Sequence, residues 1–75
     1  MSAAADAKPI NWRAVQARHQ ERLARLSNAL GAAYEGDVGF AKTKEEATYL
    51  RRRAGAYRRD AKRHLSKAEQ LRQGS

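Results

Sequence analysis

The sequence predicts an all-α fold, an antiparallel two-helix hairpin. Between Thr43 and Gln73, alanine returns every seven residues, and a second set of residues repeats three positions behind it. This spacing, kept over roughly four heptads, is typical of a coiled coil. Upstream, residues 12–34 carry apolar side chains on one face of a helix, and a glycine-containing stretch separates the two segments. No segment shows the alternation typical of a strand.

The composition is that of one small, basic domain. The chain has 75 residues, 16 Lys and Arg against 8 Asp and Glu, and a formal net charge of +8. From Lys42 onward there are 11 basic and 4 acidic residues, so the second half carries most of the excess. A chain of this size builds only a limited core, and we therefore expect a homo-oligomer or a partner. Without cysteine there is neither a disulfide nor a thiolate metal site.

The ends of the chain have little to bury. Residues 1–8 predict a disordered leader, residues 9–73 a single helical-hairpin domain, and residues 74–75 a tail. The leader lacks the basic and apolar regions of a secretory signal, and no segment has the apolar length needed to cross a bilayer. We therefore expect a cytoplasmic protein that does not bind a membrane.

The first helix is predicted from Trp12 to about Tyr34. Asn11 precedes it as an N-cap, because its side-chain oxygen can accept a hydrogen bond from a free backbone amide of the first turn. The apolar residues fall on one face at 100° per residue, with Arg18, Glu21 and Arg25 opposite, and we expect this apolar face to pack against the second helix. The face consists of Trp12, Val15, Leu23, Leu26, Leu30 and Ala33.

The loop is predicted over residues 35–42. Gly36 is placed to end the first helix in the left-handed conformation that glycine adopts easily. Val38 and Phe40 are too apolar for a free loop, and we expect them to fold back over the closed end of the hairpin. A short connection favours antiparallel neighbours.

The second helix is predicted over residues 44–73. Thr43 and Glu46 match a capping box, in which the threonine accepts from the glutamate amide and the glutamate reaches back. A break at Gly55 would give three helices, but the heptad passes through Gly55 in register, so one continuous helix is preferred. Its packing seam is predicted to consist of Ala47, Leu50, Ala54, Tyr57, Ala61, Leu65, Ala68 and Leu71, with His64 also at a heptad position. These small side chains suit close association with the first helix or with a second copy, which would give a four-helix bundle.

Basic residues line the second helix beside this seam. On a helical wheel they form two rows that flank a lane of small residues, Thr48, Gly55 and Ser66. A sugar-phosphate backbone lying in the lane could be contacted from both sides. The candidate contacts are Lys44, Arg51, Arg52, Arg58, Arg59, Lys62 and Arg63, with Gly55 allowing close approach and Tyr49 as an outward aromatic contact.

The basic helix leaves several functions open. The hypothesis we favour is sequence-independent binding of DNA or RNA, because no helix-turn-helix, zinc module or aromatic sheet platform is present for base reading. A second hypothesis is a protein-binding adaptor or inhibitor, for example one encoded by a phage, that docks this helix on an acidic surface. A structural subunit of a ribosome or virion, and a plain solvated face, are further readings of the same charges.

Catalytic and metal-binding patterns are weak. His19 and His64 have no neighbouring Cys or paired carboxylate, so each is interpreted as a packed or edge histidine. Asp60 and His64 stand at i, i+4 and can pair on the helix surface, but a pair without a nucleophile and a cleft is not a catalytic site. We therefore expect a non-enzyme with no cofactor, no metal and no small-molecule substrate.

Overall fold

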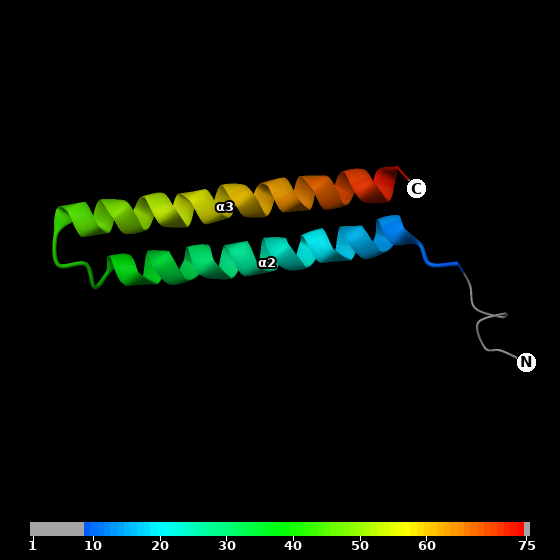
Figure 1. Cartoon of the computed structure of the whole chain (residues 1–75). Helices are drawn as coiled ribbons and strands as arrows, with labels where there is room; N and C mark the ends of the chain where they lie inside the picture. Colours follow the sequence, from blue (N-terminus) through cyan, green and yellow to red (C-terminus); the bar gives the residue numbers. More distant parts are fainter. Residues whose placement is uncertain (1–8, 75) are drawn as a thin grey trace, which may run out of the picture.

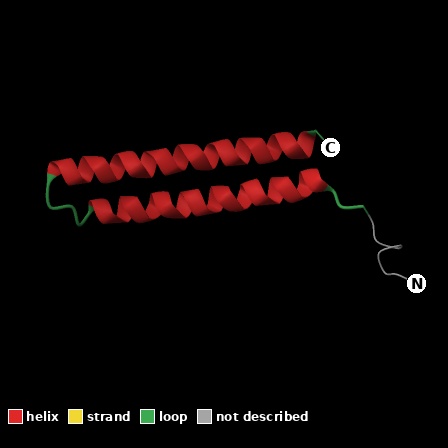
Figure 2. Cartoon of the chain, viewed as in Figure 1, coloured by secondary structure: helices red, strands yellow, loops and turns green. Residues whose placement is uncertain are grey.

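The chain folds into two antiparallel helices that lie side by side along their whole length (Figure 1). The computed structural model describes residues 9–74, and the predicted leader at 1–8 lies outside them. Helix α2 spans Trp12–Val38 and helix α3 spans Lys44–Gln73, so that they contain 27 and 30 residues. The described residues contain no strand, and one short loop joins the helices (Figure 2). The predicted all-α hairpin is confirmed.

Side-chain caps fix where each helix begins. The Asn11 Oδ1 accepts a hydrogen bond from the Ala14 amide at 3.2 Å, as predicted for an N-cap. The Thr43 Oγ1 accepts from the Glu46 amide at 3.0 Å, and the Glu46 Oε2 accepts from the Lys42 amide at 3.2 Å. The capping box is therefore present, with the glutamate reaching one residue beyond the N-cap. Helix α3 continues through residue 55 without a break, which excludes the three-helix alternative.

The predicted end of the first helix is wrong. Helix α2 continues through Gly36 to Val38, and the capping residue is Gly39 with φ −65° and ψ −18°, a right-handed conformation. No described glycine has a positive φ. Because of the added turn, Val38 is half-buried, and it lines the same hollow as Ala47 of α3. That packing offsets the cost of a helical glycine, about 1 kcal/mol relative to alanine.

Two series of small residues meet between the helices, and we call them together the alanine seam. In α3 the buried members are Ala54, Ala61 and Ala68, as the heptad predicts. In α2 they are Ala17, Ala24 and Gly31, which also stand seven residues apart. Small side chains on both helices let the backbones approach closely. The described core consists of these alanines and Gly31, and no large side chain is fully buried.

The apolar face predicted to pack against the second helix does not lie on the seam. Trp12, Leu26 and Leu30 are 64%, 56% and 46% exposed, while Val15 and Leu23 are half-buried and Ala33 is exposed. The reason is complementarity, because an alanine seam in α3 is matched by equally small residues, whereas leucines would hold the helices apart. Glu21 is also misplaced by the prediction, since it reaches α3 and pairs with Arg72.

Two further packing predictions are wrong. Leu65 is 48% exposed because the seam passes through Ala61 and Ala68 and leaves Leu65 at its edge, while Leu50, Tyr57 and Leu71 are half-buried. Phe40 is 85% exposed and does not cover the closed end, because the added turn of α2 shortens the loop that would fold it back.

Neither described helix has a stretch long and apolar enough to span a bilayer.

Candidate nucleic-acid interface

The hairpin has two different broad faces, distinguished by the side chains that cross between its helices. On one, Arg58 donates to Glu35 at 2.6 Å and Arg72 to Glu21 at 2.8 Å, and we call it the ion-pair face. On the other, the rings of Tyr34 and Tyr57 stack with centroids 5.5 Å apart. We call this the tyrosine face; by helical spacing it comprises Leu23, Leu30, Tyr34, Leu50, Tyr57 and Leu71.

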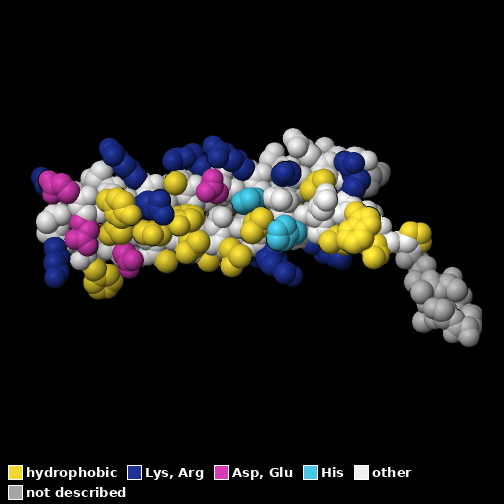
Figure 3. Space-filling view, viewed as in Figure 1, with side chains coloured by type: hydrophobic (Ala, Val, Ile, Leu, Met, Phe, Trp, Pro, Cys, Tyr) yellow, Lys and Arg dark blue, Asp and Glu magenta, His cyan; other side chains and the backbone are white. Residues whose placement is uncertain are grey.

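The predicted basic contacts all lie on α3 and are all exposed. We call them together the basic edge, which consists of Lys44, Arg51, Arg52, Arg58, Arg59, Lys62 and Arg63. In the space-filling view, Lys and Arg side chains gather along the margin of α3 that faces away from α2 (Figure 3). One helix therefore carries these positive side chains over about 30 Å of its length, given a rise of about 1.5 Å per residue.

Among the described residues, carboxylates pair with only two members of the basic edge. Arg58 is held by Glu35 across the hairpin, and the Arg63 Nη1 lies 3.5 Å from the Asp60 Oδ1 one turn away. Within residues 9–74, no salt bridge involves the other members, Lys44, Arg51, Arg52, Arg59 and Lys62. The strip thus keeps most of its charge uncompensated by the protein.

The lane of small residues is less open at its central residue, Gly55, than the sequence suggested. Thr48 and Ser66 are exposed, but Gly55 is half-buried. A Cβ atom at Gly55 would lie 3.5 Å from the Arg59 Nη1, so the guanidinium of Arg59 folds across the glycine. A phosphate entering the lane would therefore meet a guanidinium at Gly55 rather than bare backbone.

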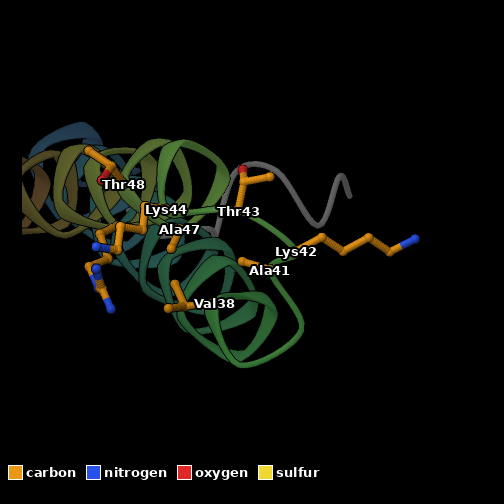
Figure 4. A pocket seen from close by; sticks show the side chains of 8 residues that line it. Val38, Ala41, Lys42, Thr43, Lys44, Ala47 and Thr48 are labelled. Atoms are coloured by element: carbon orange, nitrogen blue, oxygen red, sulfur yellow. The ribbon is translucent and has the colours of Figure 1, made fainter.

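A hollow that the sequence did not reveal opens at the loop end of the lane. It has a volume of about 580 Å³ and is lined by the loop and by the first two turns of α3. Lys44, Thr48 and Arg51 line it and also belong to the basic rows or the lane, so the two features are continuous. Val38 and Ala47 form its apolar side, while Lys42 extends away from the other lining residues (Figure 4). The sequence analysis missed this hollow because it placed Val38 in the loop, whereas Val38 belongs to the extra turn of α2 and lines the hollow.

Tyr49 stands on the outer side of α3, as predicted for a contact residue. Its side chain is 57% exposed. It lines a second hollow of about 360 Å³ together with Lys44, Glu45, Thr48 and Arg52. An exposed aromatic ring is a surface on which an unpaired base can stack, and Lys44 and Arg52 in the same lining could contact its phosphates.

Arg53 does not belong to the basic edge. Its guanidinium lies 5.7 Å from the ring centroid of Tyr34 and 5.4 Å from that of Tyr57, and its Nη2 donates to the Tyr57 hydroxyl at 3.3 Å. The hydroxyls of Tyr34 and then of Tyr57 raise the pKa of Arg53 above its ordinary value. This arginine is therefore committed to the tyrosine face.

The histidines make no site with acidic residues. His19 is exposed, and the His64 Nδ1 forms a 2.6 Å hydrogen bond with the Gln20 Oε1. Asp60 pairs with Arg63. In the part of the chain that the structure describes, no three His, Asp or Glu side chains gather closely enough to hold a metal ion.

Comparisons with protein-family models, with curated proteins and with solved structures find no match to this chain.

Proposed function

We propose that this chain is a cytoplasmic, non-enzymatic protein that binds the sugar-phosphate backbone of DNA or RNA through the basic edge of α3, without reading sequence. The observation that carries the proposal is the lack of compensation along that edge. Five exposed cations stand on one side of one helix, and none has a carboxylate partner within the described residues. A face that serves only solubility normally mixes the two signs.

The electrostatics of the edge support a polyanion as the ligand. Arg58 and Lys62 stand four residues apart, as do Arg59 and Arg63, so like charges are neighbours on the helix surface. Such pairs destabilise an isolated helix by a few tenths of a kcal/mol each. A row of phosphates removes this repulsion and accepts bidentate hydrogen bonds from each guanidinium.

The dimensions of the edge also suit a nucleic acid. Residues 44–63 rise about 30 Å along the helix axis. Duplex DNA advances about 3.4 Å per base pair, so the edge spans roughly eight to nine pairs. The hollow at its loop end, with Lys44 and Arg51 in its lining, extends the positive surface beyond the first turn of the helix.

The test is the salt dependence of binding to a labelled DNA duplex of about 20 base pairs. Binding is measured by fluorescence anisotropy between about 25 and 200 mM salt, the range in which phosphate contacts dominate affinity. We expect the logarithm of the association constant to fall linearly with log salt, with a slope near −4 to −5 if five phosphates are neutralised. Binding should weaken equally on unrelated sequences. A slope near zero, or no binding at the lowest salt, would contradict the proposal.

A matched pair of variants separates this edge from net charge. Arg52→Gln with Arg59→Gln removes two charges from α3, and Arg18→Gln with Arg25→Gln removes the same number from exposed positions of α2. The α3 variant should lower the magnitude of the salt slope by about two. The α2 variant should leave the slope close to that of the original chain. Equal losses from both would mean that only net charge matters.

An acidic protein surface is the second candidate, and one observation favours it. Exposed Tyr49 beside its own hollow resembles the central aromatic anchor of a protein interface. In this case Tyr49→Ala would abolish capture of one stoichiometric protein from nuclease-treated lysate. Loss of all captured partners on nuclease treatment would favour nucleic acid instead.

A further inference from the structure

We infer that a second copy of this chain packs against the tyrosine face and completes a four-helix bundle. This goes beyond the proposed nucleic-acid site, which occupies another side of α3. Arg59 follows Tyr57 by two residues and therefore points about 160° away from it around the helix. The two surfaces can be occupied at the same time.

The first observation is that a single hairpin has almost no core. Its buried apolar residues are alanines, and no large side chain is fully buried among the described residues. The leucines and tyrosines of the tyrosine face are instead left half-buried or exposed. A small domain needs more burial than this to offset its conformational entropy, and association is a common way to obtain it.

The second observation is the shape and extent of the apolar surface. Figure 3 shows hydrophobic side chains spread over the face turned to the viewer and along the margin of α2. Trp12, Leu26 and Leu30 of α2 are large and exposed. A layer about 40 Å long, the length of α2, and about 20 Å wide, the width of two helices, covers about 800 Å². That is about the area each partner buries in a stable, specific complex.

The third observation selects a copy of the chain over a bilayer. The tyrosine face has polar groups in its middle, where Gln20 and His64 share a hydrogen bond and Arg53 covers both tyrosine rings. Acyl chains offer these groups no hydrogen-bond partners. A flat two-helix layer whose open side is apolar is instead half of a four-helix bundle, and an identical layer related by a two-fold axis supplies the other half.

Charge fixes the relative orientation of the two copies. Arg53 and both tyrosines lie in the half of the hairpin nearer the loop, and Gln20 and His64 lie in the half nearer the chain ends (Figure 1). If both loops stood at the same end, the two copies of Arg53 would be brought together. With the loops at opposite ends, each tyrosine pair faces the half of the partner nearer its chain ends, and the arginines stay apart.

The test is the mass and the concentration dependence of the full chain, measured by sedimentation equilibrium and by thermal unfolding monitored by circular dichroism. We expect twice the chain mass of 8.4 kDa and a melting midpoint that rises with protein concentration. A mass of one chain with a midpoint independent of concentration would overturn the inference. Binding of that monomer to phosphatidylglycerol vesicles would assign the apolar face to a lipid surface instead.

Matched variants test which face is used. Leu30→Glu places a charge on the tyrosine face, whereas Ala29→Glu places it on the neighbouring exposed position outside that face. Leu30→Glu should be monomeric or unfolded, and Ala29→Glu should remain a dimer. If Leu30→Glu loses its helix content, Leu30→Ser should keep it at high concentration and raise the dimer dissociation constant about ten- to a hundred-fold. A dimer that both Leu30 variants leave unchanged would rule out this face.

The basic edge is intact in both Leu30 variants. Their salt-dependent binding of DNA can therefore be measured separately from their dimerisation.

Discussion

Gly31 of α2 lies so close to α3 that a Cβ atom at this position would be 3.3 Å from the Ala54 carbonyl oxygen. It would also lie 3.4 Å from the Cγ of Arg58. The obstacle is backbone, which can yield only if the helices separate. Gly31 is therefore the point where close approach of the helices requires glycine, whereas Gly55 on the outer side of α3 has only the flexible end of Arg59 near it.

These two glycines give a matched test of the seam. Both lie inside helices, and alanine at either should gain about 1 kcal/mol of helix propensity. Gly55→Ala should realise this gain. Gly31→Ala should not, because the methyl group must displace the Ala54 carbonyl, and we expect its free energy of unfolding to fall at least about 1 kcal/mol below that of Gly55→Ala. The measurement is urea unfolding of each variant at one fixed concentration, and equal gains would show that the helices are not in tight contact at Gly31.

A larger side chain in the middle of the alanine seam should also destabilise the hairpin. Ala24 is buried, and leucine there would have to push the helices apart, at a cost of about 1 to 3 kcal/mol. Ala29 is exposed on the same helix, so Ala29→Leu serves as the control and should change stability by less than about 0.5 kcal/mol. Chemical denaturation compares the two. A more stable Ala24→Leu would mean that the seam tolerates wider helix spacing.

The sequence was sufficient to predict the hairpin, its alanine heptad and the caps at Asn11 and Thr43, because each rests on local spacing. It was misleading for α2, where the conspicuous leucine stripe was assigned to the interior. The small residues of α2 that pack on α3 have the same seven-residue spacing, but they are Ala17, Ala24 and Gly31, which propensity and hydropathy scarcely distinguish from surface residues. Burial here follows closeness of approach rather than hydrophobicity.

The basic edge could be predicted residue by residue, since every member lies on one helix. The ion pairs across the hairpin could not be predicted from a single helix. In them, Glu35 pairs with Arg58 and Glu21 pairs with Arg72. The hollow at the loop end was also hidden, because it depends on Val38 remaining helical and lying beside Ala47. These features follow from helix register, which only the packed pair determines.

The Glu21 to Arg72 ion pair predicts a pH dependence of stability. The hydrogen bonds from Arg72 lower the pKa of Glu21 below its ordinary value of 4.5; burial opposes this shift, and the charges of Arg72, Arg25 and Arg18 add to it. A carboxyl group whose pKa is lower in the folded state stabilises the fold at pH values above its unfolded pKa. That contribution is lost as the pH falls through the folded pKa.

We therefore expect the melting midpoint to decline on acidification below about pH 4.5, and we expect Glu21→Gln to show a shallower decline. Glu69→Gln removes an exposed carboxylate that makes no salt bridge within the described residues, so it controls for the change in net charge. The measurement is thermal unfolding of the three proteins between pH 3 and 7, limits set on either side of the carboxylate range. If both variants follow the original chain at every pH, the ion pair has no net effect on stability.

The last prediction concerns a substitution in α3 that should raise the stability of the protein and lower its affinity for DNA. Gly55 lies in the lane, and Arg59 folds across it. A methyl group there improves the helix and would make only an ordinary van der Waals contact with the Arg59 Nη1, but it fills the space that a phosphate backbone would need in order to approach. Gly55→Ala should therefore raise the free energy of unfolding by about 1 kcal/mol and still weaken binding to the DNA duplex. Gly36→Ala is the control, since it adds a methyl group to a helical glycine of α2 that has nothing within 4 Å and does not belong to the lane. It should leave affinity unchanged in the same anisotropy assay. A Gly55→Ala protein that gains stability and keeps full affinity would show that no ligand enters the lane at this point, and that any phosphate contact is made by the flanking arginines alone.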